Sequence, residues 1–370
     1  MKTYLVGGAA RDMILGLESK DRDYVVVGSN EEEMLALGYS KVGESFPVFL
    51  HPETGDQYAL ARTEHKTGTG YNGFKCYTDN VSLEADLSRR DLTINSIAYD
   101  EDTKQFIDPF DGSDDLLNGI IRHTSDAFSE DPLRVLRVAR FAARFGFTVH
   151  PSTVALCKQI VNSGELDTLS YNRIWMELDK IFDEDAPSIA IKFLMDIDIW
   201  KTEKISSYVG YPISIQWESK LSKVQKMYYY LSIGVMTLED AQTFKVPLYV
   251  WKEIKFYQAL IDFIVENNFT ADLVVDFIKK HKQSFDYRLD FEFISMMKTV
   301  ASGAFKSGDL TDISINKAIT GTELLTKCYE AILSITYPLS LDSLPTESIK
   351  VVVHKMRTDA VSAVISAAHS

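Results

Sequence analysis

Two acidic residues near the start of the chain have the spacing of a metal site. Asp21 and Asp23 stand two residues apart at the start of the β-branched segment Asp23–Val27, so on a strand both carboxylates would project from the same face. Two carboxylates this close repel each other unless a cation lies between them. Carboxylate oxygens, completed by substrate phosphates and water, are ligands that Mg²⁺ prefers. The pair therefore predicts a magnesium site, with a solvated strand end as the alternative.

A glycine pair just upstream predicts a phosphate-binding turn. Gly7 and Gly8 separate the apolar segment Thr3–Val6 from Ala9–Leu15, which has helical spacing. Glycines let backbone N–H groups approach a phosphate at the N-terminus of a helix. Arg11 could reach the same phosphates with two parallel N–H bonds. Such a pair alone is usually only a turn, but next to the carboxylates it indicates a site for a magnesium-bound triphosphate.

A second polar cluster runs from Asp86 to Asn95 and contains two arginines in succession. In the functional interpretation Arg90 binds the triphosphate, while Asp91 and Asn95 hold the turn or the sugar through polar contacts. In the alternative interpretation the segment is a helix end with surface ion pairs, which contribute little to stability.

The segment Pro132–Phe145 combines helical apolar spacing with a row of arginines. At about 100° per residue, three of them fall within an arc of about 60°, with Arg134 beside it. The three are Arg137, Arg140 and Arg144. No acid follows any of these arginines four residues later. A solvated helix face normally mixes both signs of charge, so the row predicts a surface that faces an anion.

Composition and charge restrict the possible functions. The 370 residues are 45% hydrophobic and 25% charged, as in ordinary globular proteins. The net charge is −14, so nucleic-acid binding would need a local basic surface, which the arginine row supplies. No apolar run approaches membrane-spanning length, and the first residues lack the pattern of a secretory signal. Three scattered cysteines fit a reducing interior. We therefore expect a cytoplasmic protein that does not contact membranes.

The periodicity of apolar residues predicts an α+β fold with a helical remainder. Predicted strands are Thr3–Val6, Asp23–Val27, Val48–His51, Gln57–Ala61, Ile94–Asp100 and Gln105–Ile107. Predicted helices are Ala9–Leu15, Glu31–Leu37, Leu83–Leu87, Pro132–Phe145, Ser152–Ser163, Tyr171–Phe182, Ser188–Ile197, Ser219–Leu231, Leu248–Glu266, Ala271–Lys280, Tyr287–Val300 and Ile315–Leu333. The glycine-rich segment His65–Asn80 predicts a loop. The expected domains are a head with a small mixed sheet (1–113), a helical neck and body (114–204) and a helical tail (205–370).

These motifs together resemble those of class II tRNA nucleotidyltransferases, the CCA-adding enzymes. The resemblance rests on the glycine pair with Arg11 and Asp12, the two carboxylates, the segment Arg89–Asn95, and Glu130-Asp131 followed by Arg134, Arg137 and Arg140. Residues 42–51 and 59–63 resemble the bacterial branch. The match covers roughly residues 1–200 and implies a head with the nucleotidyltransferase fold of the polymerase β superfamily. The helices after it would then grip the acceptor arm of tRNA.

The resemblance also implies roles for individual residues. Asp21 and Asp23 would hold Mg²⁺ ions that activate the tRNA 3′-hydroxyl and stabilise the leaving pyrophosphate. The nucleotide would be bound by Gly8, Arg11, Arg90, Arg137 and Arg140. Asp131 and Arg134 would recognise the edge of its base. Cytosine and adenine each present an amino donor beside a ring acceptor, so a carboxylate and a guanidinium fit both. The implied reaction is the addition of C, C and A to tRNA from CTP and ATP.

The chain departs from this family in two places. Some relatives carry a C-terminal phosphohydrolase domain with a paired His-Asp motif, whereas no histidine after residue 150 of this chain is followed by aspartate. We therefore expect that activity to be missing. Superfamily members also use a third strand carboxylate, and the best placement here is Gln57, with Asp56 beside it.

Two other functions remain open on the sequence alone. A poly(A) polymerase of the same family would share this head, and an inactive tRNA-binding protein could keep the fold. The protein is expected to be a monomer. Its tRNA contacts are expected from two lysine clusters in the tail, Lys220, Lys223 and Lys226, and Lys279, Lys280 and Lys282.

Overall fold

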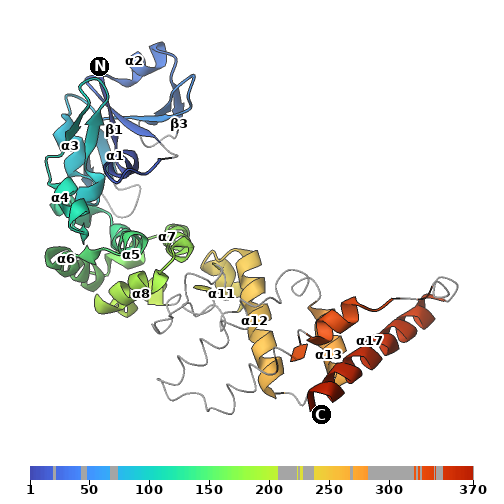
Figure 1. Cartoon of the computed structure of the whole chain (residues 1–370). Coiled ribbons are helices and arrows are strands. Elements are labelled where there is room, and N and C mark those ends of the chain that lie inside the picture. The colour runs from blue at the N-terminus through green and yellow to red at the C-terminus, as the bar shows by residue number, and fades with distance from the viewer. Residues whose placement is uncertain are drawn as a thin grey trace. The chain divides into compact units, whose positions relative to one another are not determined.

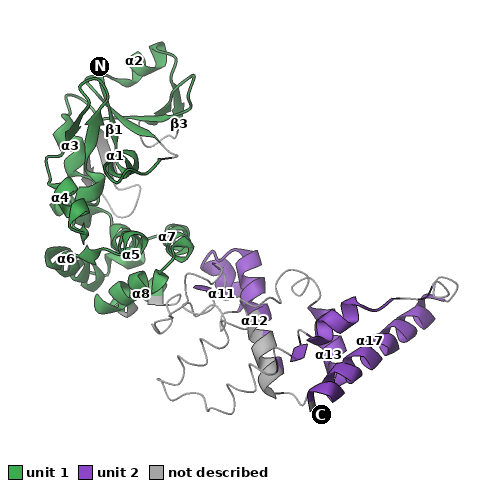
Figure 2. Cartoon of the chain, viewed as in Figure 1, with its two compact units in different colours: residues 1–209 green, residues 210–370 purple. Residues whose placement is uncertain are grey.

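A strand, a glycine turn and a helix open the structure, which is a computed structural model. It describes residues 1–19, 22–42, 48–66, 74–206, 223, 226–227, 237–266, 270–281, 321, 324–325, 327–336, 338 and 345–369. The chain forms two compact units, residues 1–209 and 210–370 (Figure 2). The predicted boundary between residues 204 and 205 lies close to this division, and the predicted boundary after residue 113 lies inside the first unit.

The head is a seven-stranded mixed sheet with helices packed around it (Figure 1). Its strands are β1 (Lys2–Val6), β2 (Asp23–Val27), β3 (Ser40–Val42), β4 (Val48–Leu50), β5 (Gln57–Leu60), β8 (Ala98–Asp100) and β9 (Gln105–Ile107). Their order is β3-β4-β5-β2-β1-β8-β9. Only β2 and β5 pair in parallel, and the other neighbours are antiparallel. The predicted small mixed sheet is therefore confirmed.

Short helices of the head follow the local signals in the sequence. They are α1 (Gly8–Ile14), α2 (Glu31–Ala36), α3 (Leu83–Ser88), the 3₁₀ helix η2 (Thr93–Asn95) and α4 (Gly112–Leu117). The side chain of Asn30 caps α2 by accepting the N–H of Glu33. Buried apolar residues of the sheet, such as Val25 and Phe49, and of α3, such as Leu87, form the core that holds these elements.

The segment His65–Asn80 differs from its prediction as a loop. Part of it lies in a two-stranded antiparallel hairpin, β6 (Thr63–Lys66) with β7 (Phe74–Tyr77). The three glycines, which favoured a loop, fall within residues 67–73, outside the described part of the chain. The hairpin forms because the flanking residues include β-branched and aromatic side chains that favour strands.

A helical layer completes the first unit. It contains β10 (Ile120–Ile121), η3 (Asp126–Glu130), α5 (Arg134–Phe145), β11 (Thr148–Val149), α6 (Pro151–Asn162), η4 (Glu165–Thr168), α7 (Tyr171–Asp183), α8 (Pro187–Asp196), η5 (Ile199–Lys201) and α9 (Glu203–Ser206). Helix α5 packs against α7 and α8 and buries an apolar face that includes Val135, Val138 and Ala142. The four helices predicted between residues 132 and 197 are confirmed to within two residues at each end.

The second unit is helical where it is described. It contains α11 (Leu238–Thr243), α12 (Leu248–Glu266), α13 (Ala271–Lys280) and α17 (Thr346–His369). Helices α12 and α13 have the predicted bounds, whereas α17 was not predicted. Tyr287–Val300 lies outside the described residues, as do most residues of Ser219–Leu231 and several of Ile315–Leu333. None of the described helices is long and apolar enough to cross a membrane.

Candidate active site

The turn between β1 and α1 brings the backbone close to an arginine from another segment. Gly7 has a φ of +67°, a conformation that side-chain-bearing residues rarely adopt. A Cβ atom on Gly7 would lie 3.1 Å from Nη1 of Arg90. The predicted glycine turn therefore exists, and the absent side chain leaves room for the Arg90 guanidinium beside the N-terminus of α1.

Asp23 is the first residue of β2, is exposed, and lines a cavity at this end of the sheet. Gln57 is its register partner on the parallel strand β5 and lines the same cavity. Asp56 instead accepts a hydrogen bond from the hydroxyl of Thr54 at 2.8 Å, within the β4–β5 turn. Of these two residues, Gln57 is therefore the one that lines the cavity beside Asp23. Asp21 lies outside the described residues.

A buried carboxylate on α3 holds the two successive arginines. Asp86 is fully buried, and its Oδ1 accepts Nη2 of Arg89 at 2.6 Å while its Oδ2 accepts Nη2 of Arg90 at 3.2 Å. Burial alone would raise the pKa of Asp86, but the two guanidinium groups lower it overall. Asp86 therefore stays ionised and fixes both arginines at the cavity.

Arg90 has an unsatisfied donor at the cavity. Its Nε is buried and has no hydrogen-bond partner in the part of the chain that the structure describes. Burial also lowers the pKa of Arg90, so the surrounding protein compensates its positive charge only in part. Arginine keeps its proton in proteins, and an incoming anion would therefore relieve this deficit. This supports the predicted nucleotide-binding role of Arg90.

Arg11 is more strongly engaged with the protein than the sequence indicated. Its Nε and Nη2 donate to Oδ1 of Asp12 at 2.9 and 2.7 Å, and its Nη1 donates to Oδ1 of Asn95 at 2.6 Å. The side chain is only 2% exposed and lies over the rings of Phe141 and Phe145. These contacts use three of the five guanidinium N–H groups and link α1 to η2. Arg11 also lines the cavity, where its other two N–H groups could meet a ligand.

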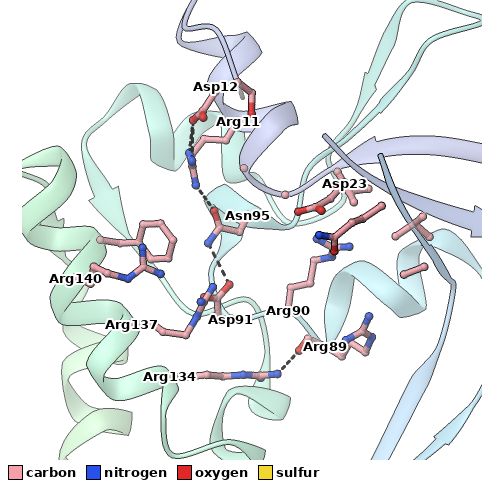
Figure 3. Close-up of a pocket in the computed structure, with 18 of the residues that line it drawn as sticks. Arg11, Asp12, Asp23, Arg89, Arg90, Asp91, Asn95, Arg134, Arg137 and Arg140 are labelled. Atoms are coloured by element: carbon pink, nitrogen blue, oxygen red, sulfur yellow. Dashed lines mark hydrogen bonds and ion pairs between the residues drawn. The ribbon is translucent and has the colours of Figure 1, made fainter. Parts of the chain in front are cut away.

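The contacts of Arg11 continue into the helical layer. Nδ2 of Asn95 donates to Asp91 at 3.2 Å, and Nε of Arg137 on α5 donates to the other Asp91 oxygen at 2.7 Å (Figure 3). Asp91 and Asn95, predicted to hold a turn or a sugar, therefore connect the glycine turn to α5. The carboxylate of Asp91 in turn raises the pKa of Arg137.

The arginine row on α5 is not the acid-free surface that its sequence predicted. Nε of Arg140 donates to Oε2 of Glu177 on α7 at 2.8 Å, and Arg140 is only 8% exposed. Oε1 of the same carboxylate lies 4.0 Å from Nη1 of Arg137. The prediction was wrong because the partner acids come from other elements, where i+4 spacing on α5 cannot reveal them. Arg144 remains exposed at the end of the row.

The two predicted base readers stand at the start of α5. Oδ1 of Asp131 accepts the N–H of Leu133 at 3.2 Å, and Oδ2 accepts Nη2 of Arg173 on α7 at 2.8 Å. Arg134 donates from Nη1 to the carbonyl of Ala127 at 2.7 Å. Its Nη2 donates to the carbonyl of Arg89, also at 2.7 Å (Figure 3). The pair is therefore held in place by η3, α7 and the segment after α3.

One cavity collects these groups. It has a volume of about 1040 Å³ and is lined by Gly8, Asp23 and every predicted nucleotide-binding residue that the structure describes. Nine arginines and Lys180 line it, against five carboxylates. Such an excess of positive charge at a cavity suits a polyanionic ligand. The volume is at the upper end of small-molecule sites, which range up to about 1,000 Å³, so it can hold a nucleotide with part of a second substrate.

Several lining residues had no role in the sequence interpretation. They are Arg62, Arg89 and Arg173. Two carboxylates that hold lining arginines, Asp86 and Glu177, also had no role there. Arg173 and Glu177 stand four apart on α7, an i,i+4 pair that could have indicated one functional face. Asp86 carried no signal of its own, because a carboxylate in an amphipathic helix normally faces solvent.

The lysine clusters predicted for the tail differ from each other. Lys226 is only 4% exposed and cannot present its charge to a partner, so that part of the prediction was wrong. Lys279 and Lys280 are exposed in the last turn of α13. Lys220 and Lys282 lie outside the described residues.

Comparisons with known proteins agree with this geometry. Residues 3–122 match the family of the poly(A) polymerase head domain, and residues 146–202 match a family described as the probable RNA and SrmB-binding site of polymerase A. A multifunctional CCA protein from Mannheimia succiniciproducens is 48% identical over 248 residues, which are 65% of this chain. The chain spans about three fifths of that relative's length, since the match covers 59% of it.

Solved structures share the fold across nearly the whole chain. A CCA-adding enzyme in complex with ATP is 22% identical, with a TM-score of 0.66 over 97% of this chain and 85% of that one. The Thermotoga maritima CCA-adding enzyme in complex with tRNA is 21% identical, with a TM-score of 0.64 over 99% of this chain and 91% of that one. Residues 3–122 are therefore similar to the poly(A) polymerase head domain, and the fold of the chain is the one seen in these CCA-adding enzymes.

Proposed function

We propose that the protein adds C, C and A to the 3′ end of tRNA without a nucleic-acid template, using CTP and ATP and releasing pyrophosphate. The 48% identity to a multifunctional CCA protein supports this reaction over other nucleotidyl transfers. The structural likeness to CCA-adding enzymes bound to ATP, CTP and tRNA supports the same substrates.

The observation that carries the proposal is the partly compensated positive charge beside Asp23. Arg90 has a buried Nε without a partner among the described residues, and burial lowers the pKa of both Arg11 and Arg90. A triphosphate supplies several anionic acceptors at once. Backbone N–H groups at the Gly7–Gly8 turn would add donors at the N-terminal end of α1.

The donors at the strand ends fit Mg²⁺. Asp23 offers a carboxylate and Gln57 an amide oxygen, with Asp21 expected to complete the pair, and Mg²⁺ accepts a few such oxygens together with substrate phosphates and water. Among the described residues no cluster of three or more acidic, histidine or cysteine side chains is suited to a metal. Bound there, Mg²⁺ would stabilise the charge that develops on the phosphates.

Asp131 and Arg134 would read the Watson–Crick edge of the incoming base. An ionised carboxylate has about four acceptor sites, of which Leu133 and Arg173 occupy two. The free sites can accept the amino group of cytosine or adenine, whereas the keto oxygen of uracil or guanine would meet a like charge. The guanidinium of Arg134, which the carbonyls of Ala127 and Arg89 hold in place, would donate to the ring nitrogen beside that amino group.

The direct test is to incubate the purified protein with tRNA lacking its 3′ CCA and with each labelled nucleotide, and to size the products. We expect incorporation from CTP and ATP that stops after three nucleotides. Asp23→Asn should lower the rate by about three orders of magnitude, because phosphoryl transfer loses a metal ligand, and leave tRNA affinity nearly unchanged. Asp196→Asn, which alters an exposed carboxylate on α8, is the matched control.

Two outcomes would replace the proposal. A long tail made from ATP alone would identify a poly(A) polymerase. This is the second candidate function, because residues 3–122 match the poly(A) polymerase head domain. No incorporation with intact tRNA binding would identify an inactive tRNA-binding protein. Incorporation at the normal rate after removal of divalent metal would contradict the metal-dependent mechanism.

A further inference from the structure

Arg173 is the first residue to consider beyond the proposed nucleotide ligands. It lies in the first turn of α7, whose N-cap Ser170 accepts the backbone N–H of Arg173 at 3.4 Å. Its guanidinium reaches across to Asp131, 42 positions earlier, and lines the same cavity. The Arg173 and Asp131 side chains are 22% and 27% exposed, so water competes only partly for this ion pair.

Asp131 has no helical backbone to fix its side chain. It follows η3 in an extended conformation and precedes Pro132, so neighbouring side chains decide which way its carboxylate points. Oδ1 is held by a weak 3.2 Å contact from the N–H of Leu133, whereas Oδ2 is held by Arg173 at 2.8 Å. The shorter, charge-assisted bond is the stronger constraint on the rotamer.

We propose that Arg173 is a positioning residue that determines base selectivity by fixing the carboxylate of Asp131 at the base-reading edge. The inference rests on the proposed function. Held on one side by Arg173, the carboxylate presents its free acceptor sites at one place in the cavity. An amino group there is favoured, and a keto oxygen there is repelled.

Loss of Arg173 should reduce the discrimination against uracil and guanine more than it reduces the affinity for nucleotides in general. Without its partner the carboxylate can rotate away from the base, which removes the acceptor for cytosine and adenine and also the repulsion against uracil and guanine. A charge-assisted hydrogen bond corresponds to about a tenfold change in an equilibrium constant, or somewhat more. Triphosphate contacts made by Arg90 and its neighbours do not pass through Arg173, so total nucleotide affinity should change less than selectivity.

The test measures binding of free CTP, ATP, UTP and GTP to the full-length protein by calorimetry, and then kcat and KM for each nucleotide with tRNA. We expect Arg173→Gln to reduce the ratio of CTP to UTP affinity about tenfold and to raise KM for CTP, with a smaller change in kcat. Arg173→Lys keeps a charge at Asp131 and should recover part of the ratio. Lys192→Gln on α8, whose partner is Asp196, is the control for loss of an exposed cation.

The outcomes separate this inference from the proposed function. If the wild-type protein binds none of the four nucleotides, the proposed function fails. If it prefers CTP over UTP and Arg173→Gln keeps that preference unchanged, the positioning role of Arg173 is wrong. Equal weakening of all four nucleotides with an unchanged ratio would also overturn it, because a purely structural role would act in that way.

Discussion

Asp91 shows how one buried carboxylate joins the two halves of the candidate site. It is 7% exposed and accepts hydrogen bonds from Leu92, Asn95 and Arg137. Burial alone would raise its pKa, but Arg137 and the hydrogen bonds lower the pKa to about 2. The ionised form is therefore the one that the folded protein prefers.

This preference predicts a pH-dependent contribution to stability. The pKa of Asp91 falls from 3.8 to about 2 on folding, which corresponds to roughly 2 kcal/mol of the free energy of unfolding. Because the folded-state pKa is depressed, this contribution is fully present above about pH 4 and is lost as the pH falls through 2. Asp91→Asn should therefore destabilise the protein more at pH 7 than near pH 3.

Urea unfolding of the wild type and of Asp91→Asn at both pH values measures the effect. The difference between the two proteins isolates Asp91 from the other groups that titrate, and Asp196→Asn gives the baseline for an exposed carboxylate. A stability difference that does not change with pH would show that the ionisation of Asp91 does not stabilise the fold.

At the scale of elements, the packing of α4 on η2 positions the network around Arg11. A Cβ atom on Gly112, the first residue of α4, would lie 2.1 Å from the carbonyl oxygen of Thr93 in η2. The φ of Gly112 is not positive, so close approach, and not backbone conformation, requires the glycine. Asn95, at the end of η2, accepts the hydrogen bond from Arg11.

Gly112→Ala is expected to destabilise the first unit by about 1–3 kcal/mol, because the methyl group must push η2 away from α4. Helix propensity alone would have favoured alanine. The displacement should also weaken nucleotide binding through Asn95 and Arg11. Thermal unfolding and CTP titration measure the two effects.

Gly164 supplies the control for this substitution. Nothing lies within 4 Å of a Cβ at that position, and its φ of +75° is one that asparagine tolerates. Gly164→Asn should therefore change the free energy of unfolding by less than Gly112→Ala and leave CTP affinity unaltered. Equal effects of the two variants would contradict the steric account of α4 and η2.

At the scale of the whole molecule, the net charge is −14 although the cavity is rich in arginine. The long-range field repels a polyanion, so tRNA binding should depend on a few concentrated contacts. Each phosphate neutralised on a duplex changes the log–log salt slope by about −0.9. A footprint limited to one arm of tRNA should therefore give a shallow slope, of about −2 to −4.

Lys279 and Lys280 are the exposed cations of the second unit that we expect to contribute to this slope. Reversing both charges should weaken tRNA binding and reduce the magnitude of the slope by up to about 2, without changing the choice between C and A. Filter binding from low to moderate salt measures both quantities. Lys350→Glu on α17 is the control within the same unit. Unchanged affinity in the double variant would place the tRNA on other residues.

Much of the architecture follows from the sequence alone. The β-branched residues of Asp23–Val27 and the periodicity of Leu248–Glu266 predicted the bounds of β2 and α12, because local propensity and the observed structure agree there. The glycine turn, Arg90 and the start of α5 were also predicted to share one site, and all three line one cavity. Helix α17 was missed because Ile349–Val353, in which four of the five residues are β-branched, is a weak local helix signal.

Only the tertiary structure decided how the charged groups pair. The arginines of α5 look unpaired in sequence, yet Arg137 and Arg140 contact Asp91 and Glu177, which are 46 and 37 positions away. Arg173 likewise meets Asp131 only through the packing of α7 beside α5. Periodicity shows which face of a helix is polar, but it carries no information about which distant element covers that face. The residue types and their spacing therefore determined the chemistry, while the packing of α5 and α7 determined which side chains remain available to a substrate.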